Sequence, residues 1–392
     1  MTTTGQGPLA GLRIVDLSAL APGPFATMLL GDLGADVVTI EGPRSRRRDV
    51  GLDDLPLMGA ATARQAGMSP LHRSRRSVVV DLKSKRGVDV ALRLVDGADV
   101  FIEGFRPGVC DRLGLGYAAV SQRAPAIVYC SLSGYGQHGR RSAAAGHDLT
   151  YLAESGLLAA GTRPGQRPGI PVNAVADFAA GGLFAAFAIV SSILGRASSG
   201  RGTYVDVSMY ESLLGLLQVS YAWTMAGAPD PSWGAGALSG AAPFYDCYRT
   251  ADDRWIAVAA IEPAFYANLC VGVGRPDLAD AQRDPSRWGE VRRGLEDAFV
   301  SDTLEAWLTR LGQVDTVAAP VRSLMEAFDE ARLSGLVSDR GTFGPWPRLS
   351  AWATAAGPVV TRPGADTRDV LAETGFAAGE IEALVAAGVV ED

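Results

Sequence analysis

Three titratable side chains occupy sequence contexts that suit proton transfer. His147 is one of only three histidines in the 392 residues, and it lies in a Gly-His-Asp motif. Asp177 precedes a long apolar run, and apolar surroundings raise the pKa of a carboxyl group, which favours acid–base chemistry. Glu262 follows another apolar run and directly precedes a proline. Each residue also has a simpler interpretation: a histidine that fills surface or core, an aspartate that caps a helix, or a glutamate in a solvated loop.

Two clusters of arginine could hold the phosphate groups of a ligand. Residues 44–48 contain four arginines and residues 73–76 contain three, whereas the whole chain has a net charge of −7. Such clusters on an acidic background suit a small polyphosphate, although a solvated loop would have the same composition. The acidic total argues against a nucleic-acid-binding protein, which needs an excess of lysine and arginine.

The elements that must position these residues alternate between strand and helix. This order predicts a parallel sheet with helices on both faces and functional groups at the carboxyl ends of its strands. The turn at residues 21–26 has a single glycine, so the dinucleotide-binding pattern G-x-G-x-x-G is missing and a nicotinamide dehydrogenase is disfavoured. Apolar, β-branched runs predict strands at 12–17, 37–41, 77–82, 100–103 and 126–132, with helices at 25–33 and 87–95.

The second half of the chain predicts a smaller α+β region after a linker. Residues 226–242 are rich in Gly, Ala, Pro and Ser, which is typical of a linker or loop, and a two-strand unit is expected at 244–250 and 255–260. Upstream, the apolar stretch 178–195 is too short for a membrane span, so we expect a buried core helix and no membrane association.

Cysteine usage and the N-terminal residues bear on the compartment. The four cysteines are far apart and form no CxxC pair, so we expect neither a zinc site nor disulfides, but buried free thiols in a reducing compartment. The first residues show no signal-peptide pattern. We therefore expect a cytoplasmic protein that holds no metal.

Motifs spread over almost the whole chain carry a family resemblance. They occupy residues 8–17, 22–24, 33–38, 81–83, 103–108, 112–114, 133–137, 199–202 and 380–390. With them the chain resembles the family III CoA-transferases, and within that family the racemase type. The resemblance implies an α/β fold with a Rossmann-like large domain, built from residues 1–225 and 336–392, and an inserted small α+β domain with linkers at 226–335. It also implies an interlocked homodimer whose active site lies between the chains.

The resemblance assigns roles to the three titratable residues. Asp177 matches an aspartate that acts as a nucleophile in the transferases, which generally lack the Gly-His-Asp motif of His147. The racemases have that histidine as a base and a glutamate in the position of Glu262. The implied activity is therefore racemisation or epimerisation of 2-methylacyl-CoA thioesters by 1,1-proton transfer through an enolate. His147, supported by Glu262, would act on one face of the α-carbon and Asp177 on the other.

Two alternatives stay open from the sequence. One is a family III CoA-transferase that uses Asp177 as its nucleophile and forms an acyl-aspartyl anhydride. The other is a CoA-thioester-binding protein without catalysis. In the racemase, the helix expected after Asp177 would offer backbone N–H groups to the enolate oxygen.

The resemblance also implies how the CoA part of the substrate is bound, with no further cofactor. The basic residue that often follows the position of Glu41 is replaced by Gly42-Pro43 before Arg44. In addition, Ala179-Ala180 stands where racemases are usually glycine-rich, which would narrow the space beside the substrate. The predicted CoA contacts are Val80, Lys83, Gly104, Phe105 and Arg112, with Arg75 and Arg76 as helpers.

Overall fold

The computed structural model describes residues 7–19, 21–43, 67, 69–337, 343–344, 346–352 and 354–392. The chain forms two compact units. Unit 1 comprises residues 1–152, 171–216 and 331–392, and unit 2 comprises residues 153–170 and 217–330. Residues 153–170 and 217–225 thus group with unit 2 by their contacts, whereas the sequence places them in the large domain. The predicted domain division at 226 and 335 stays a prediction.

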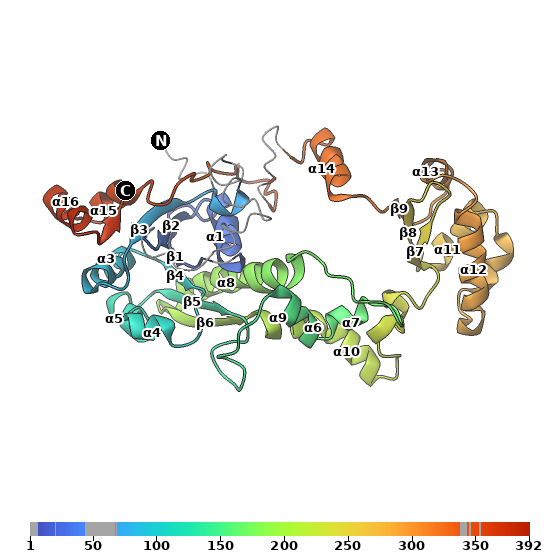
Figure 1. Ribbon diagram of the computed structural model, residues 1–392, viewed down its shortest axis with the longest axis horizontal. Coiled ribbons are helices and arrows are strands. Elements are labelled where there is room, and N and C mark those ends of the chain that lie inside the picture. Colours follow the sequence, from blue (N-terminus) through green and yellow to red (C-terminus); the bar gives the residue numbers. More distant parts are fainter. Residues whose placement is uncertain are drawn as a thin grey trace. The chain divides into compact units, whose positions relative to one another are not determined.

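Unit 1 is built on a seven-stranded sheet in the order β10-β3-β2-β1-β4-β5-β6 (Figure 1). β1 to β6 pair in parallel, and the C-terminal strand β10 is antiparallel to β3 at one edge. The predicted parallel sheet is confirmed, and the order of β1 to β6 is that of a doubly wound nucleotide-binding fold. The strands are β1 (Arg13–Leu17), β2 (Asp36–Glu41), β3 (Arg76–Val80), β4 (Val100–Glu103), β5 (Val128–Ser133), β6 (Thr203–Ser208) and β10 (Val390–Glu391).

Helices cover both faces of this sheet. On one face α3, α5, α15 and α16 share a core with alternate strand residues, while α1 and α8 pack on the other face (Figure 1). The helices of unit 1 are α1 (Pro22–Asp32), α3 (Lys85–Val95), α4 (Val109–Leu113), α5 (Tyr117–Arg123), α6 (Asp148–Glu154), α8 (Phe184–Ser199), α9 (Met209–Leu216), α15 (Thr367–Glu373) and α16 (Ala378–Ala386), with a 3₁₀ turn at Pro70–His72.

The sequence of α3 shows how a helix is fixed on the sheet. Ser84 caps its start, because its hydroxyl accepts a hydrogen bond from the backbone N–H of Gly87 at 2.9 Å. Val90 and Leu94, one turn apart, are buried against the sheet. The strands are buried on both faces, which explains their nearly continuous runs of Val and Ile.

The long apolar helix differs from its prediction in two respects. A π-helical segment, Ala174–Leu183, here called the π segment, runs directly into α8, so the helix begins before Asp177 rather than after it. It is also not a buried core helix. Its inner face is buried, but Leu183, Phe187 and Leu194 are 52%, 68% and 76% exposed. Residues 174–199 have the length and apolar character of a membrane span, which a packed helix of a soluble protein can also have.

Unit 2 contains an antiparallel three-stranded sheet, β7-β8-β9, packed against α11, α12 and α13. The predicted two-strand unit is therefore present and gains a third strand. Its helices and strands are α7 (Leu157–Ala160), α10 (Gln218–Met225), β7 (Tyr245–Arg249), β8 (Trp255–Ala259), α11 (Pro263–Gly272), α12 (Trp288–Phe299), α13 (Leu304–Leu311), β9 (Ala318–Pro320) and α14 (Leu324–Leu333). The boundary with unit 1 falls within α14. Short 3₁₀ turns lie at Ser232–Gly234, Ala237–Ser239, Pro276–Ala281 and Pro285–Arg287.

All four cysteines are free, as predicted. Cys110, Cys130 and Cys270 are buried, but Cys247 is exposed, so the expectation of burial is wrong for that residue. Cys247 lies on β7, whose side chains at alternate positions face away from the core of unit 2.

Candidate active site

A pocket of about 230 Å³ in unit 1 brings together segments that are far apart in the sequence. Its walls come from the turns after β1 and β4, the end of β5, the loop before α6, the π segment and the start of α9. The strand order reverses between β1 and β4, and doubly wound sheets bind ligands at such a switch point, beyond the carboxyl ends of the strands. Residues that represent the walls are Ser18, Phe105, Ser133, His147, Asp177 and Met209.

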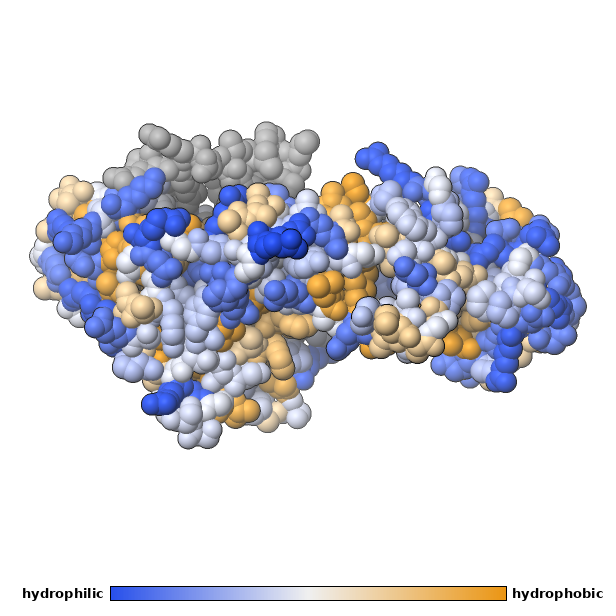
Figure 2. Space-filling model, turned by 90° about the horizontal axis from the view of Figure 1, so that it is seen from below, coloured by the Kyte–Doolittle hydropathy of each residue, from blue (hydrophilic) through white to orange (hydrophobic). Residues whose placement is uncertain are grey.

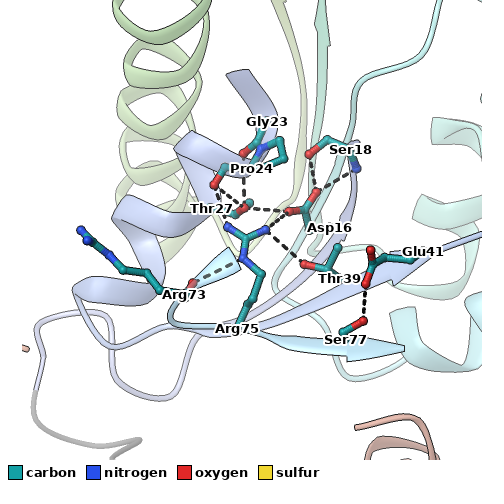
Figure 3. A network of polar contacts seen from close by, with 10 residues as sticks. All are labelled: Asp16, Ser18, Gly23, Pro24, Thr27, Thr39, Glu41, Arg73, Arg75 and Ser77. Carbon is teal, nitrogen blue, oxygen red and sulfur yellow. Dashed lines mark hydrogen bonds and ion pairs between the residues drawn. The ribbon is translucent and has the colours of Figure 1, made fainter. Parts of the chain in front are cut away.

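A buried polar network fixes the wall after β1 (Figure 3). The carboxylate of Asp16 accepts hydrogen bonds from the backbone N–H and the hydroxyl of Ser18, at 2.8 and 2.5 Å. It also accepts one from Thr27 Oγ1 at 2.7 Å and lies 3.2 Å from Nη1 of Arg75. Arg75 in turn donates to the carbonyl oxygen of Pro24 at 2.7 Å. The turn between β1 and α1 is thus held by one buried ion pair and its hydrogen bonds.

This network changes the interpretation of residues 73–76. The Arg75 side chain is only 3% exposed and is bound within the fold, so it does not present a cation to a ligand in this arrangement. Arg76 pairs with Asp36 at 2.6 Å and with Glu373 at 2.5 Å, at the amino end of β3, whereas the pocket lies at the carboxyl ends of the strands. Both arginines thus have partners within the fold, and their expected phosphate contacts stay a prediction.

The other predicted CoA contacts follow β3 and β4. Gly104 and Phe105 line the pocket. Val80 ends β3 and is fully buried, while Lys83 and Arg112 are exposed side chains of unit 1. These last three are not among the residues that line the pocket. Their contact with CoA stays a prediction.

A buried carboxylate that the sequence analysis did not single out supports the wall after β4. Glu103 is 3% exposed, and its Oε2 accepts a hydrogen bond from the backbone N–H of Phe105 at 2.8 Å. Burial raises the pKa of Glu103, while the hydroxyl of Ser131 acts in the opposite direction. Glu103 therefore holds the backbone of a residue that lines the pocket. Only its place in a family motif pointed to it.

His147 ends the loop that leads into α6, and it lines the pocket. Thr150 ties down its backbone, because Oγ1 accepts from the N–H of His147 at 3.0 Å and donates to its carbonyl oxygen at 2.8 Å. A Cβ atom at Gly146 would lie 2.4 Å from Cε1 of Tyr151, so only glycine fits beside this ring. Tyr151 also lines the pocket and was not predicted, although its place one helical turn after His147 is a signal for it.

Asp177 lines the same pocket from inside the π segment, where it is the fourth residue. The sequence predicts a raised pKa for this carboxyl group, and in the structure burial does raise the pKa of Asp177. The side chain of Asn173, which donates to Oδ2 at 3.2 Å, and the positive charge of a protonated His147 both lower it. The charge of His147 therefore acts on Asp177, the other predicted acid–base group.

Two N–H groups at the start of the helix already have an acceptor, and donation to an enolate oxygen by N–H groups after Asp177 stays a prediction. The carboxylate of Asp148 accepts hydrogen bonds from the backbone N–H of Ala176 at 2.8 Å and of Asp177 at 2.9 Å. These two donors are thus already bonded within unit 1 and do not point free at an enolate oxygen. The negative charge of Asp148 also raises the pKa of Asp177, although less than burial does.

Glu262, a predicted site residue, is not among the residues that line this pocket. Glu262 precedes α11 in unit 2, where its side chain is exposed and stands at the N-cap position of the helix. Its pairing with His147 stays a prediction. Arg44, the predicted substitute for a basic CoA contact, and the rest of cluster 44–48 lie outside the described residues.

The small residues after Asp177 serve helix packing. A Cβ atom at Gly181 would lie 2.9 Å from Cγ of Met209, and one at Gly182 would lie 2.7 Å from Cδ1 of Phe25. The glycines thus let the π segment approach α1 and α9 closely. Ala179 and Ala180, expected to narrow the space beside the substrate, are not among the residues that line the pocket.

Comparison with known proteins adds an independent line of observation. Residues 9–344 match the family described as CoA-transferase family III. The chain belongs to CoA-transferase family III. Among members of this family, the α-methylacyl-CoA racemase of Homo sapiens is 35% identical over 98% of this chain and 97% of its own length. The succinyl-CoA:glutarate CoA-transferase of Mus musculus is 31% identical over 98% of this chain and 90% of its own length.

Solved structures of the family share this fold. A CaiB/BaiF family protein from Brucella suis has a TM-score of 0.78 at 24% identity, with 94% of this chain and all of that one covered. A Mycobacterium tuberculosis protein, solved in an orthorhombic form, has a TM-score of 0.75 at 28% identity, with 93% and 99% covered. The family III homologues named above are enzymes that act on CoA thioesters, and they include both racemases and transferases.

Proposed function

We propose that the protein is a racemase or epimerase of 2-methylacyl-CoA thioesters. The observation that carries the proposal is the shared pocket of His147 and Asp177, two acid–base groups that come from different segments of unit 1. Human and mouse α-methylacyl-CoA racemases, at 35% and 36% identity over 98% of the chain, support the same assignment.

The chemistry needs two groups that exchange one proton with the substrate. One group removes the α-hydrogen as a proton, and the electron pair of the C–H bond moves into the thioester to form an enolate. The other group returns a proton to the opposite face of the α-carbon. In one direction neutral His147 accepts and protonated Asp177 donates, and in the reverse direction the roles exchange. Burial raises the pKa of Asp177, which makes its protonated form more accessible for this step.

The proposal includes a homodimer with the active site between chains. Glu262 would orient the imidazole of His147 from the partner chain. Exposed apolar side chains support an additional packing partner for unit 1, since Leu183, Phe187 and Leu194 lie on one face of the π segment and α8. Hydrophobic residues also interrupt the polar surface seen in Figure 2. The interlocked arrangement is part of the proposal.

The proposal further assigns the substrate and the setting. Lys83 and Arg112 would contact the phosphate groups of CoA, and Phe105 would pack against the ligand from the pocket wall. We propose that no cofactor beyond the CoA part of the substrate and no metal takes part. A cytoplasmic role in lipid metabolism completes the proposal.

A CoA-transferase is the second candidate, because Asp177 offers a carboxylate in the pocket and the transferase of Mus musculus is 31% identical. In that reaction the carboxylate would attack the thioester carbonyl, and the C–S bond would break. CoA thiolate would be the leaving group, and an acyl-aspartyl anhydride would form on the enzyme. A second acid would then take over the CoA. The reaction gives His147 no proton to move at the α-carbon. The third candidate is a CoA-thioester-binding protein without catalysis, in which neither His147 nor Asp177 would transfer a proton.

One experiment separates the three candidates. The protein is incubated with a single-handed 2-methylacyl-CoA in deuterated water, without an acceptor acid. The proposal predicts α-deuterium uptake together with loss of handedness. In a parallel incubation with an acceptor acid added, transfer of CoA to that acid, with a hydroxylamine-trappable acyl-enzyme and no α-exchange, would establish the transferase instead. If neither exchange nor transfer occurs at any pH, the binding protein remains.

A further inference from the structure

One carboxylate connects the two segments that carry His147 and Asp177. Asp148 directly follows His147, its residue is 6% exposed, and it begins α6. A single oxygen, Oδ2, accepts from the backbone N–H of Ala176 at 2.8 Å and of Asp177 at 2.9 Å. The side chain of Asp148 thus links the start of α6, next to His147, to the backbone of the π segment at Asp177.

The pitch of the π segment explains why these two donors need a partner. An α-helix leaves its first four N–H groups without partners in the helix, and a π-helix, which bonds i to i+5, leaves one more. Because the segment begins at Ala174 after the N-cap residue Asn173, the N–H of Asp177 is that additional donor. A carboxylate is the favoured acceptor at the positive end of a helix, and bonds to a charged group are stronger than neutral ones.

We infer that Asp148 is a positioning residue that fixes the backbone of Asp177 relative to His147 and so sets the separation of the two proton-transferring groups. The inference rests on the proposed function for its kinetic consequences. Acid–base groups act only within hydrogen-bond reach of the atom they serve, and small displacements of a positioned group cost large factors in rate. Asp148 therefore acts through Asp177 without touching the substrate.

In the part of the chain that the structure describes, the helices that pack on the π segment do not duplicate this connection. The parts of α1 and α9 that pack on the π segment face it with apolar residues, namely Pro22, Phe25 and Met209. The charges that act on the Asp177 carboxyl group are those of Asp148, which raises its pKa, and of His147, which lowers it. Removal of the Asp148 charge alone should therefore lower the pKa of Asp177 while the hydrogen bonds stay in place.

The test compares Asp148→Asn with Asp148→Ala. One oxygen accepts both hydrogen bonds, so the amide oxygen of asparagine can replace it, whereas alanine loses both. Asp148→Ala should lower kcat about 100-fold or more with KM within about threefold, because the catalytic geometry and not substrate binding is lost. Asp148→Asn should stay within about tenfold of the wild-type kcat, and the Asp177-dependent limb of its pH profile should move to lower pH.

The control is Glu154→Gln, which removes one negative charge from an exposed position at the other end of α6. It should change neither kcat nor the pH profile. An Asp148→Ala enzyme as active as the wild type would overturn the inference, and so would an Asp148→Asn enzyme that is folded but as impaired as the alanine variant. If the alanine variant does not fold, the pH profile of Asp148→Asn decides alone, and an unshifted profile contradicts the inference.

A readout without activity separates this inference from the proposed function. Hydrogen exchange of the Ala176 and Asp177 amides should be at least about tenfold faster in Asp148→Ala than in the wild type, since both donors lose their acceptor. A wild type that shows no α-exchange would end the proposed function but not this structural role. Unchanged protection of the two amides would end the positioning role even in an active racemase.

Discussion

Nη1 of Arg75 lies 3.2 Å from Oδ2 of Asp16, and the two side chains are 3% and 0% exposed. Arg75 comes just before β3 and Asp16 lies in β1, so the ion pair crosses β2 in the sheet. Because the same carboxylate holds Ser18 and Thr27, the pair connects the core of unit 1 to the pocket wall after β1 (Figure 3).

Arg75→Met should therefore destabilise the protein strongly. It leaves the Asp16 charge buried without its cation, a situation that costs about 3 kcal/mol or more, which denaturant unfolding would measure. The matched control is Arg123→Met, which breaks a surface pair with Asp96 whose side chains are 40% and 45% exposed, and should cost about 1 kcal/mol or less. Equal losses in the two variants would contradict a central role for the buried pair.

Gly146→Ala should impair catalysis more than folding. Its Cβ atom would lie 2.4 Å from Cε1 of Tyr151, so the ring or the backbone next to His147 must move. We expect kcat to fall about 10-fold to 100-fold, measured as the racemisation rate, because misplaced acid–base groups lose efficiency steeply. Gly169→Ala, where a Cβ atom meets open space, is the control and should keep the wild-type rate. A Gly146→Ala enzyme with an unchanged rate would refute the constraint.

Asp177→Asn should stabilise the folded protein at neutral pH. Burial raises the pKa of Asp177 above its value in the unfolded chain, so the folded state binds this proton more tightly. The group's contribution to folding is therefore fully present below its ordinary pKa and is lost as the pH rises through the raised one. The free energy of unfolding should be larger for the variant than for the wild type at about pH 7, and the two values should converge below about pH 4. A variant that is less stable than the wild type at neutral pH would contradict this burial effect.

Lys83→Ala should weaken substrate binding without changing the chemical step. A cation on a CoA phosphate binds ground state and transition state alike, so KM should rise about tenfold with kcat unchanged. Lys85→Ala removes a charge two residues away, on the first turn of α3, and serves as the control. If both variants bind acyl-CoA like the wild type, Lys83 is not a CoA contact.

The order of strands and helices in unit 1 could be predicted because local patterns determine it. Runs such as residues 77–82 and 100–103 are apolar and β-branched, and β3 and β4 lie there. The start of the helix at Ala174 was not predicted. Asn173 occupies its N-cap position but makes no capping hydrogen bond with its side chain, and the π pitch depends on contacts with α1 and α9.

The site was predicted in part. His147 and Asp177 follow from their motifs, and the pocket contains both. The environment of Arg75 could not be predicted, because a run of arginines reads the same in the sequence whether its side chains are solvated or paired with a buried carboxylate. The apolar residues of α8 present the same difficulty. Their spacing predicts a helix, but it does not show whether an apolar face is buried or exposed, and Phe187 on this helix is exposed.

The account depends most on His147 and Asp177 serving opposite faces of one α-carbon, and hydrogen exchange in two variants tests that directly. Each hand of a 2-methylacyl-CoA is incubated in deuterated water with His147→Ala or Asp177→Asn. Each variant should lose racemisation by about 100-fold or more, yet exchange the α-hydrogen of only one hand, and the two variants should select opposite hands. Exchange of the same hand by both variants, or undiminished racemisation in either, would contradict the two-sided mechanism.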